Sequence, residues 1–125
     1  MVEQSGDSVD ATAFEIGKRQ VDRAVVLTVS GEVDMLSAPQ LAEAIQSALA
    51  SKPAALIVDL SKVGFLASAG MTVLVSAQAD TVPPTRFVVV AQGAATSRPI
   101  KLMGIDSVLP LYSTLESALG DIADG

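Results

Sequence analysis

Three nearly continuous apolar runs, separated by segments of helical periodicity, constrain the fold of this chain most strongly. Residues 24–30 (AVVLTVS), 55–60 (ALIVDL) and 86–91 (RFVVVA) are rich in Val, Ile and Leu. Such runs are typical of β-strands that are buried on both faces. The segments between them carry apolar residues three and four positions apart, as helices that cover a sheet do. This alternation predicts a single α/β domain with a mixed, mostly parallel sheet.

Proline and hydroxyl side chains mark where the helices begin and end. Ser37 or Ala38 is a suitable N-cap, because Pro39 then falls in the first helical turn. A second helix is expected from near Ser68 to about Ala79, since two consecutive prolines follow it. The same signals predict a short helix from residue 97 to about residue 104, and a last helix over residues 115–122.

Weaker strands are expected at the edges of the sheet. Residues 14–23 alternate weakly between apolar and polar side chains and turn near residues 20–23. Residues 108–111 contain Pro110, which a central strand does not accommodate. The fold is therefore expected to hold about five strands and about four helices, with the helices mostly on one face of the sheet.

The remaining segments are interpreted as loops and chain ends. Residues 31–34 and 61–66 are expected to be loops that follow buried strands. The domain is expected to cover residues 12–122. Residues 1–11 lack periodicity and are expected to be a flexible arm, and residues 123–125 to be a frayed C-terminus.

Several functions are excluded or disfavoured by composition. The chain has no Cys and no His, which excludes disulfides, thiolate zinc sites and a Ser-His-Asp triad. Neither a phosphate-binding GxxxxGK[ST] loop nor a GxSxG elbow is present. The net charge of −6 disfavours binding to nucleic acids and to anionic membranes. With no apolar stretch long enough to cross a bilayer, we expect a cytoplasmic protein that is not an enzyme.

Three carboxylates stand near the expected strand ends. Glu32, Asp34 and Asp59 offer oxygen ligands of the kind that Mg²⁺ prefers. The alternative is structural, because Asp side chains at such positions often accept hydrogen bonds from loop amides. On this alternative, Asp34 and Asp59 stabilise turns and hold no metal, and it is the interpretation that we favour.

Ser68 is the most informative residue, since it follows a buried strand and stands at the start of an apolar helix. Its hydroxyl could cap the helix by accepting a hydrogen bond from an amide two or three residues later. It could instead be presented to a kinase. A phosphate there would add about −1.5 to −2 charges. The helix N-terminus would stabilise that charge, and a partner packed over the same place would meet a bulky anion.

Three segments together give the sequence a family resemblance. Gly31-Glu32-Val33-Asp34, Ala38-Pro39-Gln40-Leu41 and the run from Asp59 to Met71 (DLSKVGFLASAGM) resemble the STAS-domain anti-sigma factor antagonists, with the actinobacterial branch closest. The resemblance implies an antagonist that binds an anti-sigma factor with serine kinase activity and so frees a sigma factor. It also implies that the kinase phosphorylates Ser68 and ends the binding, and that a PPM-type serine phosphatase restores it.

The motif around Ser68 departs from the pattern of many family members. Those members carry an Asp before the serine and a second hydroxyl after it, where this chain has Ala67 and Ala69. Ser68 is therefore the only phosphate acceptor in the motif. Glu32 and Asp34 are expected to pair with basic partner residues, and exposed Leu66 and Met71 to supply apolar contact. For Met71, a place in the core is the equally weighted alternative. The expected partner-binding residues are Glu32, Asp34, Leu66, Ala67, Ser68, Ala69, Gly70 and Met71.

Two other hypotheses remain open. The same fold could act as a scaffold in a stress-signalling assembly without being phosphorylated, which the two alanines beside Ser68 would suit. It could also be an enzyme that uses carboxylates such as Asp34 and Asp59, although no catalytic constellation is evident. If the protein is an enzyme of this kind, changing Asp34 or Asp59 would abolish turnover.

Overall fold

The strands and helices of the computed structural model, which describes residues 14–124, follow the predicted order. Each apolar run forms a strand, and each segment of helical periodicity forms a helix. The elements are β1 Glu15–Val21, β2 Ala24–Val33, α2 Ala38–Ala50, β3 Ala55–Leu66, α3 Ser68–Asp80, β4 Arg86–Val90, α4 Ser97–Leu102, the 3-10 helix η2 Ile105–Ser107, β5 Leu111–Tyr112 and α5 Leu115–Asp124.

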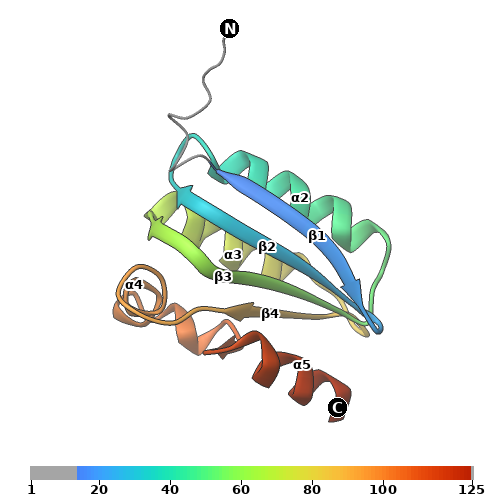
Figure 1. The fold of residues 1–125 in the computed structure, drawn as a ribbon. Helices are drawn as coiled ribbons and strands as arrows, with labels where there is room; N and C mark the ends of the chain where they lie inside the picture. The colour runs from blue at the N-terminus through green and yellow to red at the C-terminus, as the bar shows by residue number, and fades with distance from the viewer. Residues whose placement is uncertain (1–13, 125) are drawn as a thin grey trace, which may run out of the picture.

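The sheet has five strands in the order β1-β2-β3-β4-β5 (Figure 1). β1 and β2 form an antiparallel hairpin, and the pairs β2–β3, β3–β4 and β4–β5 are parallel. The mixed, mostly parallel sheet is thus confirmed, with β1 and β5 at the predicted edges. Because β2, β3 and β4 are parallel, the loops that follow them all leave from the same edge of the sheet.

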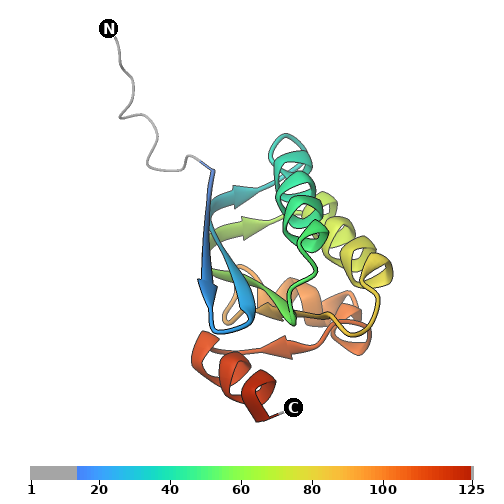
Figure 2. The same cartoon turned by 90° about the vertical axis from the view of Figure 1, so that its right-hand side faces the viewer.

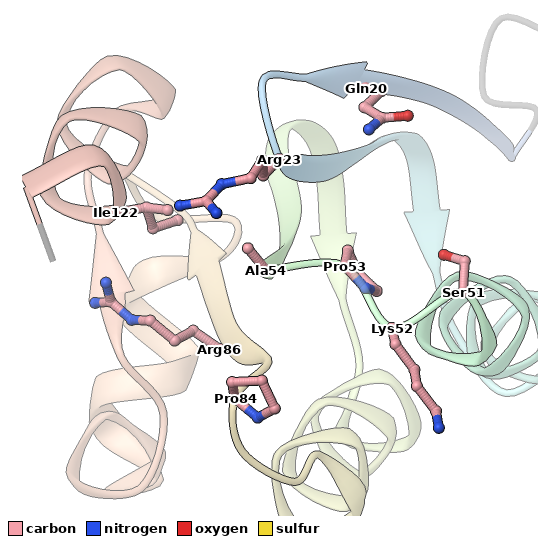
Figure 3. Close-up of a pocket in the computed structure, with 9 residues that line it drawn as sticks. All are labelled: Gln20, Arg23, Ser51, Lys52, Pro53, Ala54, Pro84, Arg86 and Ile122. Atoms are coloured by element: carbon pink, nitrogen blue, oxygen red, sulfur yellow. The ribbon is translucent and has the colours of Figure 1, made fainter.

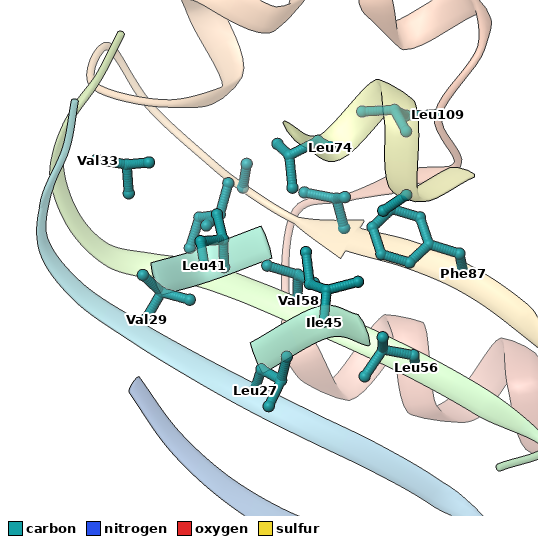
Figure 4. Packing of buried hydrophobic residues seen from close by; sticks show 14 of the residues in the cluster. Leu27, Val29, Val33, Leu41, Ile45, Leu56, Val58, Leu74, Phe87 and Leu109 are labelled. Carbon is teal, nitrogen blue, oxygen red and sulfur yellow. The ribbon is translucent and has the colours of Figure 1, made fainter. Parts of the chain in front are cut away.

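The helices divide between the two faces of the sheet, as Figure 2 shows. α2 and α3 lie side by side on one face and cover Leu27, Val29 and their neighbours, the larger part of the core (Figure 4). α5 covers the other face, where Ala118 packs against Val26 and Ile57 in a smaller cluster. Successive side chains of β2 point to opposite faces of the sheet, so they enter these two clusters in turn.

The prediction that strands end at residues 30 and 60 is wrong, because β2 runs to Val33 and β3 runs to Leu66. The expected loops 31–34 and 61–66 are largely strand, and Val33 pairs with Leu66 at the far end. Two register shifts let β3 carry extra residues opposite β2. Asp59 supports the first shift, since its Oδ1 accepts hydrogen bonds from Ser61 N at 3.0 Å and Ser61 Oγ at 2.7 Å.

The chain ends differ only in detail from expectation. The last strand is shorter and later than predicted, Leu111–Tyr112, since Pro110 has no amide to donate to β4. α5 runs to Asp124, which includes two residues of the segment expected to fray. The expected arm over residues 1–11 lies outside the described residues, so the division into arm and domain stays a prediction. Of the helices in residues 14–124, none combines the length and apolarity that a membrane crossing requires.

Candidate functional site

The Ser68 side chain lies exposed at the start of α3. Of the two roles considered for its hydroxyl, the structure does not show the helix cap. β3 keeps the backbone extended through Ala67, which has φ −83° and ψ 169° and occupies the N-cap position, so Ser68 is the first helical residue. Within residues 14–124, no hydrogen bond involves the Ser68 hydroxyl. An exposed hydroxyl without an internal partner is free to react or to contact another protein.

The backbone around Ser68 is firmly held. Ala67 N donates to Val33 O at 2.8 Å, which ties the start of α3 to the end of β2. Gly70 N and Met71 N donate to Ala67 O at 3.0 and 3.1 Å. The amides of Ser68 and Ala69 have no carbonyl one turn earlier in the helix, as at any helix start. The site therefore presents an exposed hydroxyl on a well-held backbone, beside helix amides that have no partner within the helix.

Gly70 allows α3 to pack closely against the ends of β2 and β3. A Cβ atom on Gly70 would lie 2.5 Å from Val33 Cγ1 and 2.8 Å from Leu66 Cδ1. Both neighbours are buried, so neither side chain can move aside without disturbing the core. The small residue at position 70 thus sets how near the Ser68 end of the helix lies to the sheet.

Replacing Gly70 with alanine is expected to lower the free energy of unfolding by about 1–2 kcal/mol, because overpacking typically costs 1–3 kcal/mol and exceeds the gain in helix propensity. Gly120→Ala is the matched control, since Gly120 lies in α5 with nothing within 4 Å of the added methyl. It is expected to stabilise by up to about 1 kcal/mol. Urea denaturation of both variants measures these changes, and stabilisation by Gly70→Ala would contradict the proposed close packing.

The loop between β2 and α2 is organised by Asp34. Its Oδ1 accepts hydrogen bonds from Leu36 N at 2.9 Å and Ser37 N at 3.0 Å. Ser37 Oγ in turn donates to Glu32 O at 2.7 Å and accepts from Asp34 N at 2.9 Å. The interpretation that Asp34 satisfies loop amides is confirmed. This carboxylate fixes the conformation in which the loop presents Met35 and Leu36.

The same hydrogen bonds stabilise the ionised form of the Asp34 carboxylate. The Ser37 amide, together with the Leu36 amide and the Ser37 hydroxyl, lowers the pKa of Asp34 from its ordinary value, against the opposing effect of burial. A carboxyl whose pKa is lower in the folded state contributes stability at neutral pH. That contribution is lost as the pH falls through the folded-state pKa.

Exposed apolar side chains lie at the same end of the sheet as Ser68, although they are not the ones that the sequence predicted. Met35 and Leu36 are 77% and 85% exposed, and Phe65 is 50% exposed. They lie near Ser68 because Val33 pairs with Leu66 and neighbouring strands are only about 4.8 Å apart. The tip surface is defined here as the exposed residues Glu32, Met35, Leu36, Phe65 and Ser68.

The expectation that Leu66 and Met71 are exposed contact residues is wrong. Both are buried in the main core, at 3% and 7% exposure. The register shift beside Gly64 reverses the alternation of β3, so that Val63 and Leu66 both face the helices and Phe65 faces outward. Strict alternation would have placed Phe65 with Val63, and the bulge could not be seen without the strand pairing.

The other predicted site residues divide by exposure. Glu32 is exposed and pairs in register with Phe65, which places both on the same face of the sheet. Ala67 and Ala69 are half-buried beside Ser68, and Gly70 is buried. Apolar residues between a strand end and a helix cap, as at Met35-Leu36, are the sequence signal that would have indicated this surface.

The three carboxylates considered for a metal site do not come together. Asp59 is buried and pairs in register with Thr28, whereas Glu32 and Asp34 lie at the far end of β2. No group of three or more potential ligating side chains occurs in the part of the chain that the structure describes. The arrangement around Ser68 thus combines exposed apolar side chains with an exposed hydroxyl that has no hydrogen-bond partner within residues 14–124.

Comparison with known proteins agrees with this architecture. A model of the STAS domain family matches residues 15–118, most of the described fold. The chain belongs to the STAS-domain family. This STAS domain is 43% identical over 100 residues to the anti-sigma-F factor antagonist RsfB of Mycobacterium tuberculosis, a match that covers 80% of this chain and 82% of RsfB.

Solved structures show the same fold. The crystal structure of an anti-sigma factor antagonist from Mycobacterium paratuberculosis is 42% identical to this STAS domain, with a TM-score of 0.86, and the match covers 90% of this chain and 97% of that one. SpoIIAA of Bacillus in its phosphorylated form has a TM-score of 0.64 at 17% identity, over 88% of this chain and 99% of that one. At that identity the likeness to SpoIIAA shows the fold alone.

Proposed function

We propose that this STAS domain is an anti-sigma factor antagonist, which binds an anti-sigma factor through the tip surface and thereby frees a sigma factor. The observation that carries the proposal is the Ser68 hydroxyl, which is exposed, unbonded within residues 14–124 and at the same end of the sheet as exposed Met35, Leu36 and Phe65. Two relatives more than 40% identical bear the name of anti-sigma factor antagonist. Because a sigma factor acts on transcription, we propose the cytoplasm as the location.

The tip surface suits binding to a partner with an apolar patch and a basic rim. Met35, Leu36 and Phe65 offer large apolar side chains, and Met and aromatic side chains are enriched at protein–protein interfaces. Glu32 lies beside them, and the chain carries a net charge of −6. Negative charge steers association with a basic surface and improves its specificity.

Phosphorylation of Ser68 would switch this binding off. A phosphoserine brings about −1.5 to −2 charges. The amides at the start of α3 would stabilise the phosphate within the protein. On docking, however, the charge would have to be desolvated against an apolar contact, which opposes binding. We propose that the anti-sigma factor is itself the serine kinase and that a PPM-type serine phosphatase restores the unmodified state.

Ala67 and Ala69 fit this proposal through what they lack. Neither side chain offers a hydroxyl that could take the phosphate in place of Ser68. Neither offers an acceptor that could hold the Ser68 hydroxyl, so it stays available to a kinase. Phosphorylation within the motif would therefore be confined to a single position.

Incubation with the anti-sigma factor and ATP is expected to add one phosphate, detected by intact-mass measurement, and the modified residue is expected to be Ser68. Ser68→Ala is expected to gain no phosphate. Ser76→Ala removes another exposed serine of α3 and is the matched control, which is expected to gain one phosphate. Absence of phosphate on the wild type in a kinase-active mixture would refute the switch and support an unphosphorylated scaffold instead.

A further inference from the structure

At the end of the sheet opposite Ser68, three basic residues line one cavity of about 620 Å³ (Figure 3). Arg23 lies in the turn before β2, Lys52 follows α2, and Arg86 begins β4. The chain has 8 Lys and Arg against 14 Asp and Glu, yet none of the acidic residues of the described chain lines this cavity. Such segregation of charge in an acidic protein indicates a place suited to an anion.

The walls of the cavity are preformed by hydrogen bonds between neighbouring elements. Ala54 N donates to Arg23 O at 3.0 Å, and Arg86 N donates to Ala54 O at 3.0 Å. Thr85 Oγ1 donates to Pro53 O at 2.7 Å and joins the loop before β4 to the loop before β3. Ligand sites in proteins are usually preformed concavities of about 300–1,000 Å³. This cavity falls within that range.

The charged groups leave a net positive charge at one side of the cavity. In Figure 3, the side chains of Arg23 and Arg86 both extend toward Ile122 of α5, whereas Lys52 points away from them. Arg86 Nη2 lies 3.3 Å from Asp121 Oδ2, which holds the Arg86 side chain in place. On that side, two cations and this one carboxylate leave one positive charge, and Lys52 adds a second positive charge elsewhere on the lining. The total of two matches a phosphate monoester at neutral pH.

We infer that this cavity binds a small phosphorylated molecule, with the phosphate between Arg23 and Arg86. Guanidinium groups bind phosphate through two parallel hydrogen bonds, which makes paired arginines effective for this anion. An adjoining cavity of about 270 Å³ shares Arg23, Ala54 and Ile122 and adds Leu119, with Asp22 also on its lining. The side chains of Leu119 and Ile122 would contact the apolar body of the ligand. The inference is independent of the function proposed for Ser68, which lies a full strand length, about 30 Å, away.

Titration with phenyl phosphate at constant ionic strength, followed by amide NMR spectra, tests this inference. Saturable shifts are expected at the amides that surround the cavity, such as those of Ala54 and Arg86. Inorganic phosphate is expected to bind more weakly at the same place, since it lacks the apolar ring. Benzoate, which carries the ring on a monovalent carboxylate, is expected to bind more weakly still. Benzoate binding as tight as phenyl phosphate would overturn the assignment to phosphate.

Arg23→Gln is the informative variant. Within residues 14–124 the Arg23 side chain makes no hydrogen bond or ion pair, whereas Arg86 is paired with Asp121. The Arg23→Gln variant is expected to weaken phenyl phosphate binding about tenfold or more through loss of a charge-assisted contact. Arg98→Gln, on exposed α4 at the other end of the sheet, is the matched control and is expected to bind as wild type does. Shifts that stay linear, or equal binding by the two variants, would overturn the inference.

Discussion

Replacing Ser68 with glutamate is expected to weaken binding to the anti-sigma factor by about 5- to 150-fold. The added carboxylate would lie among Met35, Leu36 and Phe65 on the tip surface, where docking removes water from it. Desolvation of the carboxylate and its placement against apolar side chains are expected to lower the binding free energy by about 1–3 kcal/mol. A phosphate carries more charge than glutamate, so the modified protein is expected to bind more weakly still. Isothermal titration calorimetry with the purified anti-sigma factor measures the dissociation constants.

Two variants control this experiment. Ser68→Ala adds no charge and is expected to retain wild-type affinity. Ser76→Glu places the same new carboxylate on exposed α3, about 12 Å further along the helix axis, and is also expected to bind normally. Equal affinities for Ser68→Glu and the wild type would show that the start of α3 is not part of the docking surface, and the proposed switch would be abandoned.

Replacing Leu74 with alanine is expected to lower the free energy of unfolding by about 2–5 kcal/mol. Leu74 is fully buried on α3, among the core residues around Phe87 and Leu109 shown in Figure 4. The change removes apolar contacts and leaves a cavity that the surrounding side chains fill only in part. Equilibrium denaturation in urea measures the loss as a shift of the midpoint at an unchanged slope.

Leu36→Ala makes the same chemical change at a side chain that is 85% exposed. Its effect on the free energy of unfolding is expected to stay within about 0.5 kcal/mol. Because Leu36 belongs to the tip surface, the same variant is expected to weaken partner binding. A Leu74→Ala protein as stable as Leu36→Ala would mean that α3 does not pack on the sheet as described.

Local sequence rules located Ser68 well. A strand-forming run, a short connection and an apolar helical stripe place residue 68 at a helix start whatever the rest of the chain does. The role of its hydroxyl was less accessible to such rules. Whether Ser68 or Ala67 occupies the N-cap depends on how far β3 continues, and that is decided by its pairing with β2.

The side chains that surround Ser68 could not be assigned from the sequence. Leu66 and Phe65 are both apolar neighbours in one strand, and only the bulge beside Gly64 decides that Leu66 enters the core and Phe65 faces solvent. Bulges depend on hydrogen bonds between strands far apart in the sequence. Met71 was left open between core and surface, and the structure places it in the main core.

What the sequence alone determined was the order of strands and helices, the mixed and mostly parallel sheet, and the place of Ser68 at the start of a helix. These follow from periodicity and turn residues, which act over a few neighbouring positions. Only the tertiary structure decided which side chains stay exposed beside Ser68, and that Arg23, Lys52 and Arg86 meet at one cavity. Strand register and parallel crossovers bring such distant residues together, and their energetics depend on the whole sheet.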